Sequence, residues 1–130
     1  MRLIVCGSRD FDDAKLLAHV LDNIWQNANF PALTVVHGGA RGADSLAGEW
    51  ARSSLTTHVG KVAEEVHMAE WDKRGNAAGP FRNRAMAASG ADLCLAFWDG
   101  KSRGTADMLG AATQYNIRSQ IVPWKRKNGT

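Results

Sequence analysis

Short apolar runs alternate along the chain with segments in which apolar residues recur at helical spacing. The first run, Arg2–Gly7, is continuous and β-branched, which is typical of a strand buried on both faces. Behind it, Leu17 and Leu21 mark the apolar face of a helix that Asp12 or Asp13 can cap. Further strands are predicted at 33–38, 61–68, 91–98 and 119–124, and further helices at 42–54, 79–90 and 104–116.

This alternation within 130 residues predicts a single α/β domain. Its core is expected to be a mostly parallel five-stranded sheet with helices on both faces, a doubly wound, three-layer sandwich. We expect the domain to occupy residues 1–124 and the basic segment 125–130 to form a flexible tail.

Composition narrows the class of protein. Apolar residues make up 45% and charged residues 22% of the chain, as in soluble globular proteins. A net charge of +3 is too small to indicate nucleic acid by itself. Cys6 and Cys94 lie in strand-like runs, so we expect buried free thiols in a reducing compartment, and no Cys/His spacing indicates zinc. With neither a signal peptide nor an apolar run of about 18 residues, the expected location is the cytoplasm and not a membrane.

Three glycine-containing clusters follow predicted strands. They are GSR (7–9), HGGARGAD (37–44) and WDGKSRGT (98–105). Each combines glycine, the free amides of a helix start and an arginine, which suits a phosphate group. Because ligands of open α/β sheets bind beyond the carboxyl ends of the strands, these clusters predict one shared anion or nucleotide site.

A fourth segment points to the same edge of the sheet. Arg82, Asn83 and Arg84 fall in the first turns of a predicted helix, where positive charge opposes the helix dipole unless an anion is near. Solvent-facing arginines are the alternative interpretation. Neither the dinucleotide fingerprint nor the P-loop motif occurs, which disfavours ordinary dehydrogenases and NTPases.

Together, GSRDF, HGGARGAD, GPFRNRAM and DGKSRGTADM resemble the SLOG superfamily, and within it the small YspA/YpsA-related domains. More distant similarity is to the LOG phosphoribohydrolases and to DNA-processing protein A. The resemblance implies a Rossmann-like fold and a nucleotide or nucleotide-derived ligand of the AMP, NAD or ADP-ribose kind. No other cofactor and no metal is implied.

The resemblance also implies which residues bind the ligand, in four groups. They are Gly7, Ser8 and Arg9 for phosphate or ribose; Gly38, Gly39, Arg41, Gly42 and Asp44 in the second loop; Arg82 and Asn83 from the helix; and Gly100, Gly104 and Thr105 around a phosphate. In LOG enzymes a glutamate follows the last glycine motif and is catalytic. Here Met108 stands at that position, and Asp107, one residue earlier, is rotated by about 100° on a helix.

Binding without catalysis, as a sensor or carrier, is therefore the first hypothesis. The alternative is hydrolysis of an N-glycosidic bond, for which Asp44 and Arg82 are the candidate catalytic residues. Asp44 can equally stabilise a helix start, and Asp99 a turn. His37 fits a structural role better than a catalytic one.

Other interpretations concern aromatic residues and partners. Trp98, or else Trp71, could stack on a base, with plain packing as the alternative. Single-stranded DNA binding is disfavoured, because the basic residues form no stripe with interleaved aromatic residues. Small residues in 84–91 and 109–113 would permit a homodimer or larger homo-oligomer, or simply close packing on the sheet.

Overall fold

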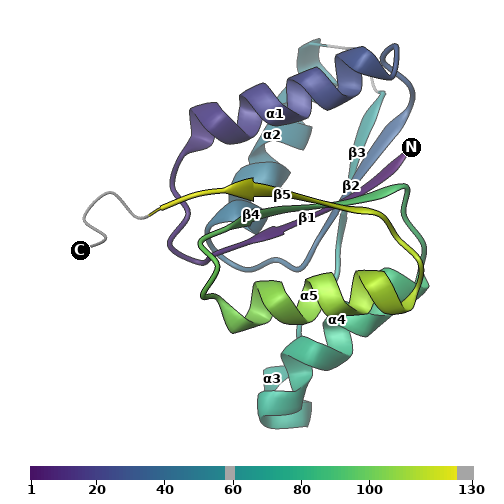
Figure 1. The fold of residues 1–130 in the computed structure, drawn as a ribbon. Coiled ribbons are helices and arrows are strands. Elements are labelled where there is room, and N and C mark those ends of the chain that lie inside the picture. The colour runs from purple at the N-terminus through teal and green to yellow at the C-terminus, as the bar shows by residue number, and fades with distance from the viewer. Residues whose placement is uncertain (58–60, 126–130) are drawn as a thin grey trace.

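The computed structural model describes residues 1–57 and 61–125. These residues form five strands, five α-helices and one short 3-10 helix, η1; strands and helices alternate except between β3 and β4, where α3, η1 and α4 follow one another (Figure 1). The strands are β1 (Arg2–Gly7), β2 (Leu33–His37), β3 (Val62–Val66), β4 (Leu93–Trp98) and β5 (Ser119–Pro123). The helices are α1 (Ala14–Asn27), α2 (Ala43–Thr57), α3 (Trp71–Arg74), η1 (Gly75–Ala77), α4 (Ala78–Ala88) and α5 (Arg103–Gln114).

All five strands are parallel and lie in the order β3-β2-β1-β4-β5. The chain builds outward from β1 to β3, then crosses to the other side of β1 and continues with β4 and β5. The direction of winding therefore reverses between β1 and β4, where loops leaving the two strands diverge and open a crevice. This confirms the predicted Rossmann-like sandwich.

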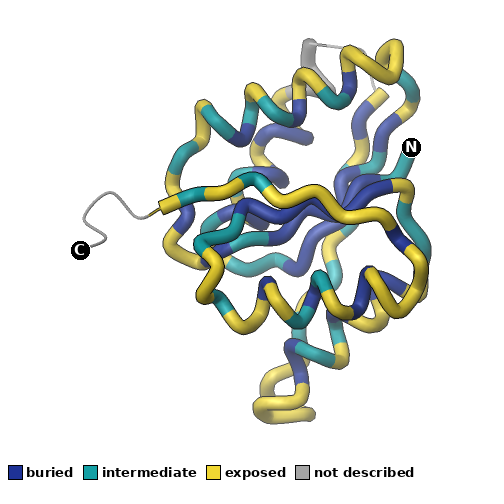
Figure 2. The backbone as a smooth tube through the Cα atoms, viewed as in Figure 1, coloured by how far each residue is buried: buried dark blue, intermediate teal, exposed yellow. Residues whose placement is uncertain are grey.

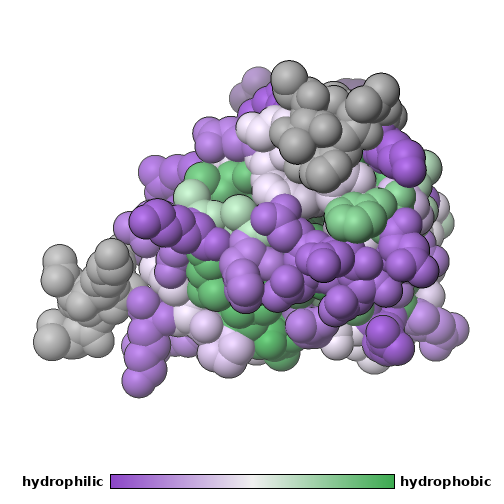
Figure 3. Space-filling view, turned by 90° about the horizontal axis from the view of Figure 1, so that it is seen from above, coloured by the Kyte–Doolittle hydropathy of each residue, from purple (hydrophilic) through white to green (hydrophobic). Residues whose placement is uncertain are grey.

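One apolar layer joins α1 and α2 to the upper face of the sheet (Figure 1). Asp13 caps α1 by accepting a hydrogen bond from the Leu16 backbone N–H at 3.1 Å, and Leu17, Leu21 and Trp25 point inward. Burial of each leucine contributes about 1.5–3 kcal/mol to folding. The opposite side of α1 is polar. Hydrophilic residues cover much of this face of the molecule in Figure 3.

A second apolar layer joins α4 and α5 to the lower face of the sheet. It includes Met86, Ala87, Ala111 and Ala112, so some of the small residues in both candidate oligomer segments pack on the sheet. Gly90 has a φ of 88° just beyond α4, which confirms the predicted glycine at the end of this helix.

The two cysteines are buried free thiols on this lower face, as predicted. Cys6 lies on β1 and Cys94 on the adjacent β4. A hydrogen bond with Cys94, together with burial, raises the pKa of Cys6 well above its ordinary value, so that thiol stays protonated.

The structure refines several predicted boundaries. The second helix runs to Thr57 rather than residue 54, and β3 covers only Val62–Val66. The short helices α3 and η1 were not predicted, and α3 stands at the exposed lower end of the molecule (Figure 2). The predicted tail, apart from Lys125, lies outside the described residues. Within the described ranges, no helix combines the length and apolarity that crossing a bilayer requires.

Candidate functional site

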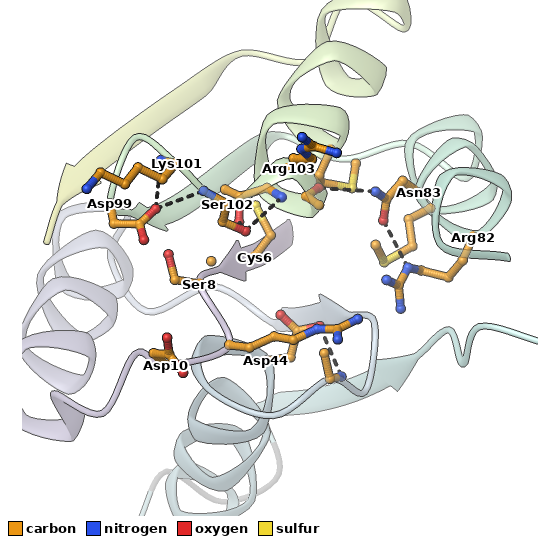
Figure 4. Close-up of a pocket in the computed structure, with 17 residues that line it drawn as sticks. Cys6, Ser8, Asp10, Asp44, Arg82, Asn83, Asp99, Lys101, Ser102 and Arg103 are labelled. Atoms are coloured by element: carbon orange, nitrogen blue, oxygen red, sulfur yellow. Dashed lines mark hydrogen bonds between the residues drawn. The ribbon is translucent and has the colours of Figure 1, made fainter. Parts of the chain in front are cut away.

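A cleft of about 440 Å³ opens where the winding reverses (Figure 4). It is bounded by the loops after β1 and β4, the start of α5, the loop before α2, and α4. The lining residues are Cys6, Gly7, Ser8, Arg9, Asp10, Ala40, Asp44, Arg82, Asn83, Met86, Asp99, Lys101, Ser102, Arg103, Gly104, Thr105 and Met108. Four cationic side chains and three carboxylates are among them, so the cleft is polar with a small positive excess.

The loop after β1 forms one wall and depends on glycine for its position. A Cβ atom at Gly7 would lie 2.5 Å from the carbonyl oxygen of Phe97 and 2.7 Å from the Cβ of Ala43. Only glycine therefore lets this loop pass between β4 and α2. The next residue, Ser8, is 3% exposed, and among the described residues its hydroxyl oxygen finds no hydrogen-bond partner. It still lies near enough to Asp99 to help lower the pKa of that carboxyl.

The loop after β4 and the start of α5 form the opposite wall (Figure 4). The Asp99 carboxylate accepts hydrogen bonds from the backbone N–H groups of Lys101 at 2.8 Å and Ser102 at 2.9 Å, which lower its pKa. Ser102 is the N-cap of α5, with its hydroxyl 3.1 Å from that of Thr105. The first N–H groups of a helix have no partner inside the helix, so amides at Arg103 and Gly104 are available to an anion.

Gly104 keeps this helix start open. A Cβ atom built there would meet no other atom within 4 Å, and the residue borders the cleft. Packing within the protein therefore does not require glycine at this position. A side chain there would instead project toward the N-terminal end of the helix, into space that a bound group could use.

Asp44 connects α2 to the preceding loop. The residue is 6% exposed, and its carboxylate accepts hydrogen bonds from the backbone N–H groups of Gly38 at 2.9 Å and Ala40 at 3.3 Å. Burial raises its pKa, partly offset by these bonds. Asp44 therefore lies in the first turn of α2, where it was predicted, but its carboxylate bonds the preceding loop, and it also borders the cleft.

Arg82 and Asn83 reach the cleft from α4. Arg82 donates from Nη1 to the Gly38 carbonyl oxygen at 2.6 Å and from Nε to the Asn83 side chain at 2.9 Å. Burial lowers the pKa of Arg82, while the Asp44 charge raises it. Asn83 in turn donates to Asp107 at 2.9 Å. These bonds fix the guanidinium in place, and its Nη2 makes no hydrogen bond within the described part of the chain.

The structure brings eight of the fourteen expected ligand-binding residues to the cleft: Gly7, Ser8, Arg9, Asp44, Arg82, Asn83, Gly104 and Thr105. Gly38, Gly39 and Arg41 line a smaller hollow beside it, together with Arg9 and Arg82. The remaining three, Gly42, Trp98 and Gly100, border neither space.

Local packing explains these three exceptions. Gly42 has a φ of 83°, and a Cβ there would lie 2.4 Å from the Ser8 carbonyl oxygen, so it permits two loops to touch. Trp98 donates its indole N–H to the Ser102 carbonyl oxygen at 3.1 Å and packs on the lower apolar layer. Gly100 makes a turn with a φ of 81°.

Glycines of the second loop accommodate other parts of the protein. A Cβ atom at Gly38 would clash with the Arg82 guanidinium, and one at Gly39 with the Met68 sulfur. His37 has the structural role favoured from its sequence context. Its Nδ1 accepts a hydrogen bond from the Gly39 N–H at 3.0 Å, and its Nε2 lies 2.5 Å from Glu64.

Sequence reasoning missed several lining residues. Asp10 directly follows the first glycine cluster, and Lys101, Ser102 and Arg103 lie inside the third cluster but were not singled out as ligand-binding residues. Cys6, Ala40 and Met86 carried no such signal. No group of three or more potential metal-ligating side chains occurs among the residues that the structure describes.

The side chains of Met108 and Asp107 point in different directions from α5, as their adjacent positions on a helix predict. Met108 is 1% exposed and presents an apolar group to the cleft. Asp107 does not border the cleft, because it faces Asn83 and a groove along α5. No carboxylate of α5 therefore reaches the space beside its N-terminus.

Comparison with known proteins agrees with this architecture. The YspA, cpYpsA-related SLOG family matches residues 1–73, more than half of the chain, including the loops after β1 and β2. The gene 61 protein of Mycobacterium phage D29 is similar along nearly the whole length. It is 38% identical over 116 residues, which cover 89% of this chain and 91% of the phage protein. The chain therefore belongs to the YspA, cpYpsA-related SLOG family.

Proposed function

We propose that this protein binds a nucleotide or nucleotide-derived ligand, of the AMP, NAD or ADP-ribose kind, as a sensor or carrier. The observation that carries the proposal is the open start of α5 at Gly104, where unpaired amides meet empty space in a polar cleft. Membership of the SLOG family supports a nucleotide-related ligand.

The surrounding groups suit a phosphate in this position. The positive end of the α5 dipole favours an anion, and the amides of Arg103 and Gly104 can donate to its oxygens, whereas the Thr105 amide already donates to the Ser102 side chain. The buried Ser8 hydroxyl has a hydrogen bond to give. Arg82 is held in place by Gly38 and Asn83, so its remaining N–H groups are preorganised for an anion.

The carboxylates suit the hydroxyl groups of a ribose. Asp99 and Asp10 lie on either side of Ser8 (Figure 4), and ionised carboxylates accept hydrogen bonds from hydroxyl groups. The low pKa of Asp99 keeps it ionised at neutral pH. A nucleotide with its phosphate at the start of α5 and its sugar toward Asp99 would therefore form hydrogen bonds with both walls of the cleft.

Binding is favoured over hydrolysis because of the residues at α5 and α2. Met108 offers no proton-transfer group, and Asp107 is bonded to Asn83. Asp44 is committed to two backbone amides, although its burial and raised pKa keep N-glycosidic hydrolysis as the second candidate.

Titration calorimetry with AMP, NAD, ADP-ribose and inorganic phosphate, followed by chromatography of the mixtures, tests this proposal. We expect saturable binding of at least one nucleotide, which is recovered unchanged. Absence of binding at millimolar concentrations would refute the proposal. Release of free base or ribose phosphate, abolished in Asp44→Asn, would establish the hydrolase instead. Asparagine retains an oxygen acceptor for Gly38 and Ala40, so this variant removes the charge and preserves the loop.

A further inference from the structure

A second hollow of about 230 Å³ adjoins the cleft. The two spaces share Arg9, Ala40 and Arg82, so they adjoin at two guanidinium groups. The other residues that line the hollow are Gly38, Gly39, Arg41, Met68, Ala69 and Trp71. It therefore combines a cationic side next to the cleft with an apolar side.

Trp71 supplies a large part of the apolar side. It begins α3 and is 48% exposed, although tryptophan is among the most apolar side chains. A Cβ atom at Gly79 would lie 3.3 Å from the Cη2 atom of the indole, so the glycine lets the ring rest on α4. Met68 is 68% exposed, and its sulfur lies over Gly39. The ring is thus supported by the protein at one edge and open to solvent elsewhere.

We propose that this hollow is the base subsite, in which the planar base of the ligand stacks on Trp71 beside Met68. This assignment rests on the proposed function and deepens it. Phosphate groups lie in the main cleft, and Arg9 and Arg82 contact the linking part of the ligand between the two spaces. Bases stack well on tryptophan and on guanidinium planes, and the hollow offers both.

The base subsite is therefore at Trp71 and not at Trp98. The Trp98 indole is engaged with Ser102 and the lower apolar layer, and it borders neither space. Trp98 is the last residue of β4, whereas Trp71 comes five residues after the end of β3. What separates them is α3, which turns Trp71 back toward the loop after β2.

A second copy of the chain is the competing occupant. Val66, Met68, Trp71 and Phe81 are all large, hydrophobic and exposed at this end of the molecule. However, an apolar face of another copy would bury Arg9 and Arg41 while offering them no opposite charge, which is costly. A nucleotide supplies both the aromatic ring and the anion, so it fits the hollow better.

The test compares ligands with and without a base. Dissociation constants are measured by calorimetry for AMP, ADP-ribose and ribose 5-phosphate with wild type, Trp71→Leu and Phe81→Leu. Phe81 is the matched control, because it is 50% exposed on α4 and borders neither space. We expect Trp71→Leu to weaken the tighter of the two base-bearing ligands by about 5- to 100-fold. Ribose 5-phosphate should change by less than about twofold, and Phe81→Leu should alter neither affinity.

Trp71→Phe separates stacking from folding, since it restores an aromatic ring and should recover most of the affinity. Equal losses for all ligands, or no loss at all, would overturn the base subsite while leaving nucleotide binding intact. If wild type bound none of the three ligands, the proposed function and the subsite would fail together. A dimer that dissociates in Trp71→Leu, without discrimination between ligands, would assign the surface to a second copy instead.

Discussion

Replacement of Gly104 by alanine should have opposite effects on the stability of the fold and on its affinity for the ligand. Glycine inside a helix is less stable than alanine by about 0.5–1 kcal/mol. A Cβ atom at Gly104 meets nothing within 4 Å, so the variant should gain this stability without strain. For a domain of this size, we expect the melting temperature to rise by about 2–5 °C.

The affinity of this variant for the ligand should fall. The new methyl group would occupy space beside the amides where we place the phosphate, and would displace its oxygens from hydrogen-bond distance. Loss of one hydrogen bond to a charged group costs about 1.5–3 kcal/mol. That corresponds to roughly 10- to 100-fold weaker binding. Thermal denaturation and calorimetry with the same nucleotide measure both effects.

Gly110→Ala is the matched control for this variant. Gly110 lies on the same helix, and an added Cβ there also meets nothing within 4 Å, but the residue does not border the cleft. This control should show a similar gain in stability with unchanged affinity. If Gly104→Ala bound the nucleotide as tightly as wild type, the phosphate would not lie at the start of α5.

Three further variants probe the walls of the cleft and the edge of the sheet. Ser8→Ala removes a buried hydroxyl that lacks a hydrogen-bond partner among the described residues. Thermal stability should therefore stay equal or rise, while nucleotide affinity should fall by about three- to tenfold. A loss of stability above about 1 kcal/mol would contradict this. Gly7→Ala would place a Cβ 2.5 Å from the Phe97 carbonyl oxygen, so urea denaturation should show a loss of about 2 kcal/mol or more, and wild-type stability would contradict the close approach. Hydrogen bonding with Arg2 lowers the pKa of Glu65 to about 2. Because that pKa lies below the unfolded value of about 4.3, the stabilisation is full above pH 5 and is lost as the pH falls toward 2. Glu65→Gln should therefore be less stable than wild type at pH 7, by under about 1 kcal/mol because the Arg2–Glu65 pair is partly exposed. This difference in stability should vanish near pH 2. A difference in stability that does not depend on pH would argue against the ion pair.

The sheet could be predicted because its three central strands, β1, β2 and β4, are short, mostly apolar and largely buried. The β1 and β4 segments contain almost no polar side chains, and such runs with intervening helices fit few other architectures. The edge strand β3 was harder to delimit, since Glu64 and Glu65 interrupt its apolar pattern to pair with other charged side chains. α3 has only four residues and no buried side chain, so it left no periodic signal.

The candidate site was predictable only in part, for a similar reason. Glycines that follow strands indicate close approach, but the sequence does not say what approaches. At Gly38 it is the Arg82 side chain, and at Gly39 it is Met68, both from distant segments. Gly104, in contrast, borders open space. Only the three-dimensional arrangement separates a glycine needed for packing from one that leaves room for a ligand.

The most direct measurement is a crystal structure of the protein with the nucleotide that binds most tightly in solution. We expect a phosphate oxygen within about 3 Å of the Arg103 or Gly104 amide, with Arg82 as a further contact. The base should then lie against Trp71. A nucleotide whose phosphates lie away from the start of α5, for example on the surface of another helix, would contradict the account.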